Sequence, residues 1–405
     1  MNPDLAHVVT SGACIGCGLC AGVSDAVDMV RTDEGRERPK VTGPLGDKAS
    51  DIAAACPGLR VEGLAAEETD ARFDPIWGHI DDAFIGWAGD PQIRHQGSTG
   101  GVLSALAKHL LDTREVDFIL DVAPDPSAPA RTRHRISETW SDAGGSRYGP
   151  AAPLAGLAEA KKRAESGQRF AFIGKPCDVS AIRILARRQP WLETALAYRL
   201  TLICGGASEF SKTANLLAGW NVAEADLESL RYRGNGNPGP TRAVLKSGEA
   251  YQTSYQALWE DEGTWAIQHR CKICPDAIGM AGDVVSFDVW PDANPVGEDE
   301  GFNGVLTRSP QGAALVEAAL RSGALVKDRP IGPDDLNSFQ PHQVRKRRAV
   351  WARLAGQRAA GRVAPETCDL GEKAIARSQT WRSQMAEAKG TRNRLKAGRG
   401  TEVAP

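Results

Sequence analysis

Residues 14–20 read Cys-Ile-Gly-Cys-Gly-Leu-Cys, three cysteines with two residues between neighbours. Thiolates at this spacing can wrap a compact loop around one 4Fe-4S cluster, and Gly16 and Gly18 let the backbone approach its sulfides. Bacterial two-cluster ferredoxins continue with a cysteine where this chain has Ser24, and they carry a second such run, which is missing here. We therefore expect a single ferredoxin-like cluster on Cys14, Cys17 and Cys20, closed by the distant Cys56.

Two other uses of these cysteines have to be weighed. Four cysteines also bind zinc tetrahedrally, although zinc sites usually use paired C-x2-C knuckles rather than three evenly spaced thiolates. A disulfide framework is disfavoured, because residues 1–10 lack the basic-then-apolar build of an export signal and a cytoplasmic compartment is reducing. The spacing favours the cluster over both.

The later cysteines form a second candidate set. Cys177 lies in Gly-Lys-Pro-Cys-Asp, Cys204 in Ile-Cys-Gly-Gly, and Cys271 and Cys274 form a C-x2-C followed by proline. Cys177 and Cys204 each follow an apolar run typical of a strand, and strand ends of an open α/β sheet gather at one rim. The four thiolates can therefore converge on a second 4Fe-4S cluster, with Cys368 left over; the alternative is that Cys177 and Cys204 are small buried hydrophobic residues.

Composition and charge limit the class of protein, its compartment and its partners. The chain has 405 residues, 41% hydrophobic and 25% charged, which is typical of a soluble protein of two or three domains. No apolar stretch approaches the roughly 18 residues that span a bilayer, so we expect a cytoplasmic protein without membrane contact. From residue 345 onward there are 15 Lys and Arg against 5 Asp and Glu. The run 345–348 predicts an exposed helix. Its basic face is either merely solvated or a docking surface for an acidic electron carrier. Nucleic-acid binding is not expected.

The apolar pattern predicts three regions. Residues 1–70 form a small unit that ends in an acidic linker at 63–70, residues 71–330 form an α/β core around a mixed sheet, and residues 331–405 form a basic helical extension. The strands are expected at 83–87, 116–122, 170–173, 196–203, 284–289 and 304–307, and helices at 102–111, 154–164 and 311–322. The run 234–240, rich in Gly, Asn and Pro, must be a loop.

A glycine-rich turn runs directly into the helix expected at 102–111. Its residues are Gln96, Gly97, Ser98, Thr99, Gly100 and Gly101. Backbone N–H groups freed by glycine, together with a helix N-terminus, favour phosphate or an electron-rich ring. The spacing matches neither the dinucleotide fingerprint nor the Walker A loop, so a plain loop capped by Ser98 or Thr99 remains the alternative.

Several of these stretches resemble one family. The segments 97–106, 172–178, 204–206, 271–276, 282–285 and 302–308 occur in the order seen in the coenzyme F420 hydrogenase/dehydrogenase beta-subunit family. The resemblance implies an iron–sulfur flavoprotein oxidoreductase, with FAD at the glycine turn and the second cluster on Cys177, Cys204, Cys271 and Cys274. Members of the family serve deazaflavin-reducing hydrogenase or formate dehydrogenase complexes, and others reduce chlorophyll-type rings with electrons from ferredoxin. Ser24 and the part beyond Arg345 depart from the resemblance.

An iron–sulfur cluster passes one electron at a time, whereas a flavin can deliver two electrons. Clusters and flavin in one protein therefore convert one-electron transfer into two-electron chemistry. We expect electrons from ferredoxin or a similar donor to pass through both clusters to FAD and on to a small-molecule two-electron acceptor, such as a deazaflavin coenzyme, a tetrapyrrole or another unsaturated compound. The alternative is the flavin-bearing electron-transfer subunit of a hydrogenase or formate-dehydrogenase-type complex. Gln96, Ser98 and Thr99 would tune the flavin, and Arg94 and His95 would orient substrate or supply a proton, although a surface role for His95 is open. Lys175 would raise the potential of the second cluster or be merely solvated.

Overall fold

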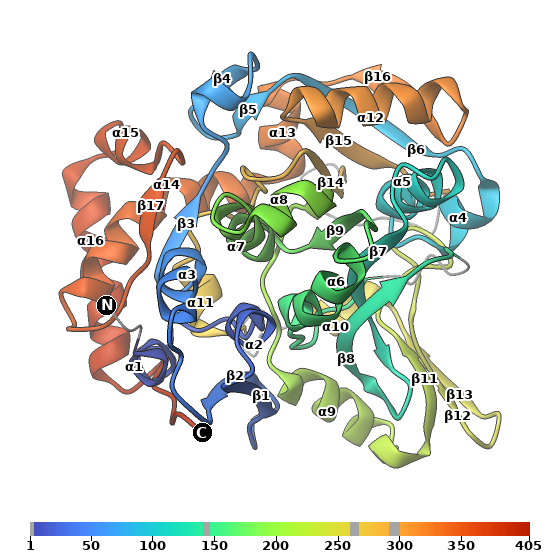
Figure 1. Ribbon diagram of the computed structural model, residues 1–405. Helices are drawn as coiled ribbons and strands as arrows, with labels where there is room; N and C mark the ends of the chain where they lie inside the picture. Colours follow the sequence, from blue (N-terminus) through green and yellow to red (C-terminus); the bar gives the residue numbers. More distant parts are fainter. Residues whose placement is uncertain (1–3, 141–145, 260–266, 291–299) are drawn as a thin grey trace.

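A mixed sheet of eight strands runs through the middle of the molecule (Figure 1). The computed structural model describes residues 4–140, 146–259, 267–290 and 300–405. The strand order is β16-β6-β15-β14-β10-β9-β7-β8. The bounds are β6 (Asp82–Ala88), β7 (Phe118–Asp125), β8 (Ala128–Ser137), β9 (Phe170–Gly174), β10 (Leu196–Leu202), β14 (Val284–Asp288), β15 (Asn303–Thr307) and β16 (Leu325–Pro330). The central strands β14, β10, β9 and β7 are parallel, and antiparallel strands flank them. The predicted α/β class with a mixed sheet is confirmed.

Helices cover both faces of this sheet, which is why its central strands are apolar on both sides. Helices α5 (Val102–Asp112) and α12 (Pro310–Arg321) pack on one face. The other face is covered by α6 (Leu157–Ala164), α7 (Pro176–Ala186), α8 (Pro190–Ala195), α13 (Pro333–Phe339) and the start of α14 (Pro341–Arg358). Every residue of α7 is buried, as expected for a helix that is largely apolar all round.

One rim of the sheet collects the predicted functional segments. The parallel strands β9 and β10 end there, and Asp288 at the end of β14 lies opposite Asn303 at the start of β15. Strand β6 runs in the same direction as β14, because both are antiparallel to β15. The segments that carry Cys177, Cys204 and the glycine turn therefore leave the sheet on the same side, as predicted for strand ends of an open α/β sheet.

The N-terminal unit contains α1 (Leu5–Thr10), α2 (Leu19–Val23), β1 (Val27–Arg31), β2 (Glu37–Val41), α3 (Lys48–Ala55) and β3 (Arg60–Glu62). Ile15, Leu19 and Ala55 share an apolar core with α7 and β9. The N–H of Leu154 donates to the carbonyl of Cys17 at 2.8 Å. The unit is thus packed against the sheet layer rather than set apart from it.

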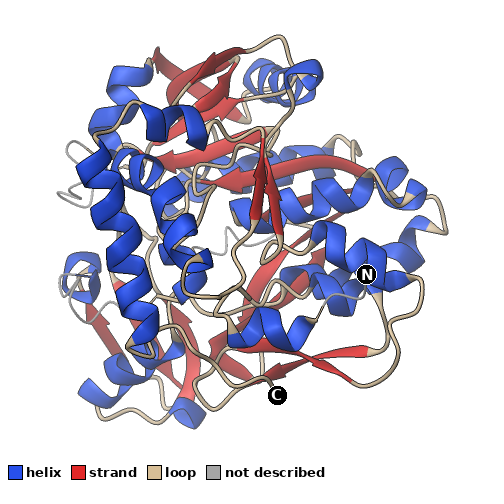
Figure 2. Cartoon of the chain, turned by 90° about the vertical axis from the view of Figure 1, so that its left-hand side faces the viewer, coloured by secondary structure: helices blue, strands red, loops and turns tan. Residues whose placement is uncertain are grey.

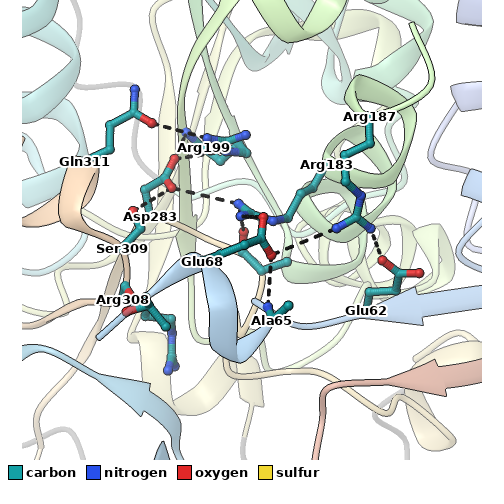
Figure 3. A network of polar contacts seen from close by, with 12 residues as sticks. Glu62, Ala65, Glu68, Arg183, Arg187, Arg199, Asp283, Arg308, Ser309 and Gln311 are labelled. Carbon is teal, nitrogen blue, oxygen red and sulfur yellow. Dashed lines mark hydrogen bonds and ion pairs between the residues drawn. The ribbon is translucent and has the colours of Figure 1, made fainter. Parts of the chain in front are cut away.

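The segment predicted as a linker is fastened to the core by ion pairs (Figure 3). Glu62, directly before this segment, pairs with Arg187, directly after α7, and Glu68 within the segment pairs with Arg183 of α7 at 2.6 Å. Arg183 also lies 4.0 Å from the buried Asp283. The segment predicted as an acidic linker is therefore joined to α7 through the carboxylate of Glu68.

The C-terminal extension folds back onto the N-terminal unit. Helices α14, α15 (Glu372–Arg377) and α16 (Trp381–Lys396) lie on the left in Figure 1, and Figure 2 views the molecule from that side. Strand β17 (Glu366–Cys368) pairs in parallel with β3. The predicted exposed helix is wrong for Arg347, which is buried and donates to the carbonyls of Ile76 at 3.0 Å and Pro275 at 3.2 Å. A cation can be buried there because several carbonyl oxygens surround it.

The remaining elements lie outside the main sheet. They are β4 (Arg72–Asp74), β5 (Gly78–Ile80), α4 (Pro91–Gln96), α9 (Phe210–Gly219), β11 (Leu227–Arg231), β12 (Thr241–Leu245), β13 (Ala250–Thr253), α10 (Tyr255–Trp259), α11 (His269–Lys272) and the short 3-10 turns η1 (Ala66–Glu68), η2 (Pro153–Gly156) and η3 (Glu224–Asp226). Strands β11, β12 and β13 form a separate antiparallel sheet. In the part of the chain that the structure describes, no helix is both long and apolar enough to cross a membrane.

Candidate functional site

The first four cysteines border one hollow. Cys14, Cys17, Cys20 and Cys56 line it together with apolar side chains, which are Leu5, Val8, Ile15, Leu19, Met29, Pro39 and Pro57. The loop curls inward because Gly16 and Gly18 have φ angles of 70° and 81°, which side chains other than glycine adopt only with strain. The N–H of Gly16 points at Cys14 Sγ, 3.4 Å away. The structure therefore brings together the four residues that the spacing predicted.

Burial suppresses the ionisation of these four thiols. It raises the pKa of Cys14, strongly raises that of Cys17, and with the neighbouring Cys14 raises the pKa of Cys56 to about 11. Cys20 behaves likewise, with Cys14 and Cys56 adding to the effect of burial on its pKa. Thiolates in such a place need a cationic centre to hold their charge, which is what a bound metal cluster supplies.

The second set is assembled from three separate parts of the chain. Cys177 lies in the first turn of α7, Cys204 follows β10, and Cys271 and Cys274 lie in and just after α11. Burial raises the pKa of Cys204 to about 12, and Cys271 and Cys274 add to this. Burial also raises the pKa of Cys177, with smaller contributions in the same direction from Cys274 and Cys204. The four sulfur atoms are therefore electrostatic neighbours, and the N–H of Ala207 donates to Cys271 Sγ at 3.2 Å.

The arrangement of ligands differs from that around a single ion. Among the described residues, no three His, Cys, Asp or Glu side chains are placed to share one metal ion. In a cubane cluster each thiolate binds its own iron, so the four sulfur atoms surround a volume rather than meet at a point. A hollow bordered by four thiols is suited to such a group.

The two sets lie close to each other. Cys17, Cys177 and Cys271 belong to one apolar core. After burial, the largest influence on the pKa of both Cys17 and Cys177 is the buried carboxylate of Asp178, which raises both. Asp178 is therefore close to a cysteine of each set. The ninth cysteine, Cys368, lies in β17.

Lys175 lies beside the second set rather than at the glycine turn. Its ammonium group pairs with Asp178 at 2.6 Å. Burial lowers its pKa, but Asp178 and Cys177 outweigh that effect and hold it above its ordinary value. The charge of Lys175 is thus largely offset by its own carboxylate partner.

The glycine turn is held by Asn303 at the start of β15. Asn303 Oδ1 accepts from the N–H groups of Gly100 at 2.8 Å and Val102 at 3.3 Å, and its Nδ2 donates to Thr99 Oγ1. One N–H group of the predicted anion-receiving turn and the first N–H group of the following helix are therefore already used. Helix α5 begins with Gly101 as its N-cap, at φ 71° and without a side-chain cap, so the alternative of a Ser98 or Thr99 cap is not what the structure shows.

Arg233 is a buried residue of this region that the sequence pattern did not reveal. Its guanidinium group donates to the carbonyl of Ser98 at 2.7 Å and pairs with Asp288 at 3.0 Å. The rings of Tyr255 and Trp290 lie 4.8 Å from it. Its Nε–H is buried without a hydrogen-bond partner among the described residues. An unsatisfied donor beside the glycine turn indicates a place for a ligand acceptor atom.

The two residues predicted to serve substrate chemistry differ in their surroundings. Arg94 donates to the carbonyl of Gly301 at 2.7 Å and stacks on the ring of Trp87 at 4.1 Å. His95 is exposed, and its carbonyl accepts from the N–H of Gly236 at 3.1 Å. Arg94 therefore braces the turn, whereas the His95 side chain is presented to solvent.

The family model described as coenzyme F420 hydrogenase/dehydrogenase, beta subunit N-term matches residues 83–158, and the companion model for the C terminus of the same beta subunit matches residues 167–331. Together they cover more than half of the chain. The chain belongs to the coenzyme F420 hydrogenase/dehydrogenase beta-subunit family, whose members are components of oxidoreductases.

Two individual proteins are similar to the chain. The F420-dependent formate dehydrogenase 1 subunit beta of Methanococcus maripaludis is 27% identical over 260 residues, which is 62% of this chain and 62% of that protein. A chain in the structure of the F420-reducing [NiFe] hydrogenase complex from Methanosarcina barkeri superposes with a TM-score of 0.53 at 18% identity. That match covers 68% of this chain and 92% of the other and shows the fold.

Proposed function

We propose that the chain is an iron–sulfur flavoprotein oxidoreductase that carries two 4Fe-4S clusters and one FAD. The observation that carries this proposal is the closeness of two four-thiol sets, since Cys17, Cys177 and Cys271 share one apolar core near the sheet rim that also bears the glycine turn. When bound, the clusters would transfer single electrons and the flavin would convert them to two-electron chemistry.

The chain's own residues have distinct parts in this function. The thiolates would hold the clusters, while Leu5, Val8, Met29 and Pro39 exclude water from the first one. The glycine turn and the unpartnered Nε–H of Arg233 would bind and orient FAD. Arg94 and His95, at the entry to the turn, would contact the substrate.

The donor and acceptor can be arranged in two ways. In the first, ferredoxin or a similar protein delivers electrons to the Cys14 set, and a deazaflavin coenzyme, a tetrapyrrole or another unsaturated compound accepts two electrons at the flavin. In the second, the chain is the flavin-bearing subunit of a hydrogenase or formate-dehydrogenase-type complex. The names of the two similar proteins favour the second arrangement, with coenzyme F420 as the acceptor.

Metal and flavin analysis tests the cofactors. Anaerobically purified protein should contain about eight irons, eight sulfides and one FAD per chain, as two cubane clusters and one flavin require. Cys56→Ser and Cys271→Ser should each remove about four irons, whereas Cys368→Ser, outside both sets, should remove none. An iron-free protein, or a Cys271→Ser chain with the full iron content, contradicts the proposal.

A second measurement separates the two arrangements. Purified chain with reduced ferredoxin and the oxidised deazaflavin coenzyme should be assayed alone, and the chain should be isolated from its host with its tightly bound partners. Turnover by the isolated chain supports the complete reductase. Turnover only in a preparation that contains a hydrogenase- or formate-dehydrogenase-type subunit supports the complex.

A further inference from the structure

Helix α14 (Pro341–Arg358) lies outside the residues that the family models match, which end at residue 331. It nevertheless passes both thiol sets. Gln343 Nε2 donates to the carbonyl of Cys204 at 3.0 Å. Near the other end of the helix, Gln357 Nε2 donates to the carbonyl of Ser11, three residues before Cys14, also at 3.0 Å. The extension is therefore built into the region that the proposed function assigns to electron transfer.

One face of α14 is turned toward the second thiol set. Val350 and Leu354 pack on Ile273, which lies between Cys271 and Cys274 in sequence. Arg347 donates to the carbonyl of Pro275, next to Cys274, at 3.2 Å. Positions 343, 347, 350 and 354 follow helical spacing, so Lys346 lies on the same side of the helix, three residues after Gln343 and four before Val350.

Lys346 brings an uncompensated charge to this face. It is partly buried, and no carboxylate of the described residues forms an ion pair with it. Lys346 is one helical turn from Gln343, which donates to the carbonyl of Cys204, and one turn from Val350, which packs on Ile273 between Cys271 and Cys274. Lys175, the lysine that the sequence singled out for this role, is instead offset by Asp178 at 2.6 Å.

We propose that Lys346 is an electrostatic positioning residue for the cluster on Cys177, Cys204, Cys271 and Cys274, and that its charge raises the reduction potential of that cluster. The inference rests on the proposed function, because it needs a cluster at the second set. Reduction by one electron from the donor protein adds one negative charge to the thiolate-bound group. A nearby cation without a carboxylate partner stabilises that added charge, and so favours the reduced form.

The test is an anaerobic redox titration of the full chain followed by electron paramagnetic resonance, with iron content measured on each sample. In Lys346→Gln the ratio of reduced to oxidised second cluster at a fixed potential should fall about threefold to tenfold, where tenfold corresponds to about 59 mV for a one-electron couple. Lys346→Arg should retain the parent potential, because it keeps the charge. Arg345→Gln is the matched control, since Arg345 is exposed on the same helical turn. The potential of the first cluster should not change in any variant.

The outcomes separate this inference from the proposed function. An eight-iron protein in which Lys346→Gln leaves the second potential unchanged, or shifts it no more than Arg345→Gln does, overturns the inference alone. Loss of iron in both Lys346→Gln and Lys346→Arg marks a packing role and also overturns it. A parent protein without iron at the second set removes the proposed function and the inference together.

Discussion

The two thiol sets are encoded in different ways. Three cysteines of the first set lie within residues 14–20, and the loop conformation that joins them depends on the positive φ angles of Gly16 and Gly18. The second set draws on residues as far apart as Cys177 and Cys274, which only the order of β9, β10 and β14 brings to one rim. One set is therefore a property of a loop and the other a property of a sheet.

Local encoding does not make the first set independent of the rest of the chain. The guanidinium group of Arg38, near Cys14, is bound by the carboxylate of Glu402, close to the C-terminus, at 2.6 and 2.9 Å. The second set has its own contact with the extension through Arg347. Both sets thus depend on residues beyond the family-model region, and variants of those residues can show which set depends on them more.

The largest effect is expected from Glu402→Gln, which acts on the first set. The Arg38 side chain is fully buried and that of Glu402 is 5% exposed. Removing the carboxylate leaves a buried guanidinium charge without compensation, which typically costs about 3–5 kcal/mol of unfolding free energy. Urea unfolding under anaerobic conditions, followed by tryptophan fluorescence, should show a loss of about this size.

The matched control is Glu387→Gln. Glu387 pairs with Arg353 at 2.8 Å, but both side chains are partly exposed. Exposed pairs contribute about 0–1 kcal/mol, so the control should unfold almost like the parent. Equal losses in the two variants would mean that the C-terminal segment does not support the first set.

A smaller effect is expected from Arg347→Met, which acts on the second set. The variant removes the donors to the carbonyls of Ile76, Pro275 and Leu370. Each buried acceptor left without a donor costs about 1–3 kcal/mol, and the apolar replacement offsets part of this sum because a buried charge no longer has to be desolvated. An iron chelator should then remove iron faster from the second set than from the first, as judged by the electron paramagnetic resonance signals of the two clusters. Arg348→Met, on the exposed side of the same helix, should behave like the parent, and a matching loss there would assign the effect to general helix stability.

The sequence predicted the central sheet well and its edges poorly. All six predicted strands are present, because their continuous apolar runs are typical of strands covered on both faces. Strand β16 was not predicted, since Val326 to Pro330 are exposed and the strand carries several charges. The antiparallel sheet of β11, β12 and β13 was missed for a related reason, because its strands are short, bury few residues and lack a long apolar run.

The residues of the candidate site also divide into those that the sequence predicted and those that it did not. The eight cysteines could be named from spacing, strand ends and family resemblance, and the structure brings each set of four together. The roles of Asn303, Arg233 and Lys346 could not be predicted, although Asn303 lies in the segment 302–308 and Lys346 in the basic run 345–348, because each acts on a segment that is distant in sequence. Such roles depend on the tertiary fold, which spacing along the chain does not reveal.

The smallest expected effect is a difference of roughly 1 kcal/mol between two glycine variants, and it tests whether the loop conformation of the first set alone suffices. Gly18 has φ 81°, and a Cβ there would lie 2.9 Å from Ala152 Cβ and 2.8 Å from the N atom of Ala155. Gly167 has the same φ of 81°, but a Cβ there would meet no atom of the described residues within 4 Å. Gly167→Ala therefore reports the conformational cost alone, about 1–2 kcal/mol.

Gly18→Ala should lose roughly 1 kcal/mol more than Gly167→Ala in urea unfolding, because it adds a backbone clash to the same conformational strain. It should also lower the iron content of the first set, since the clash pushes the cysteine loop away from the turn η2 of the core. If the two variants lose equal stability and both keep all their iron, the close approach of Gly18 to the core has no energetic weight. The conformation of the first set would then depend on its loop alone. The first set would differ from the second, which the sheet assembles, by more than the contacts of Gly18 with the core indicate.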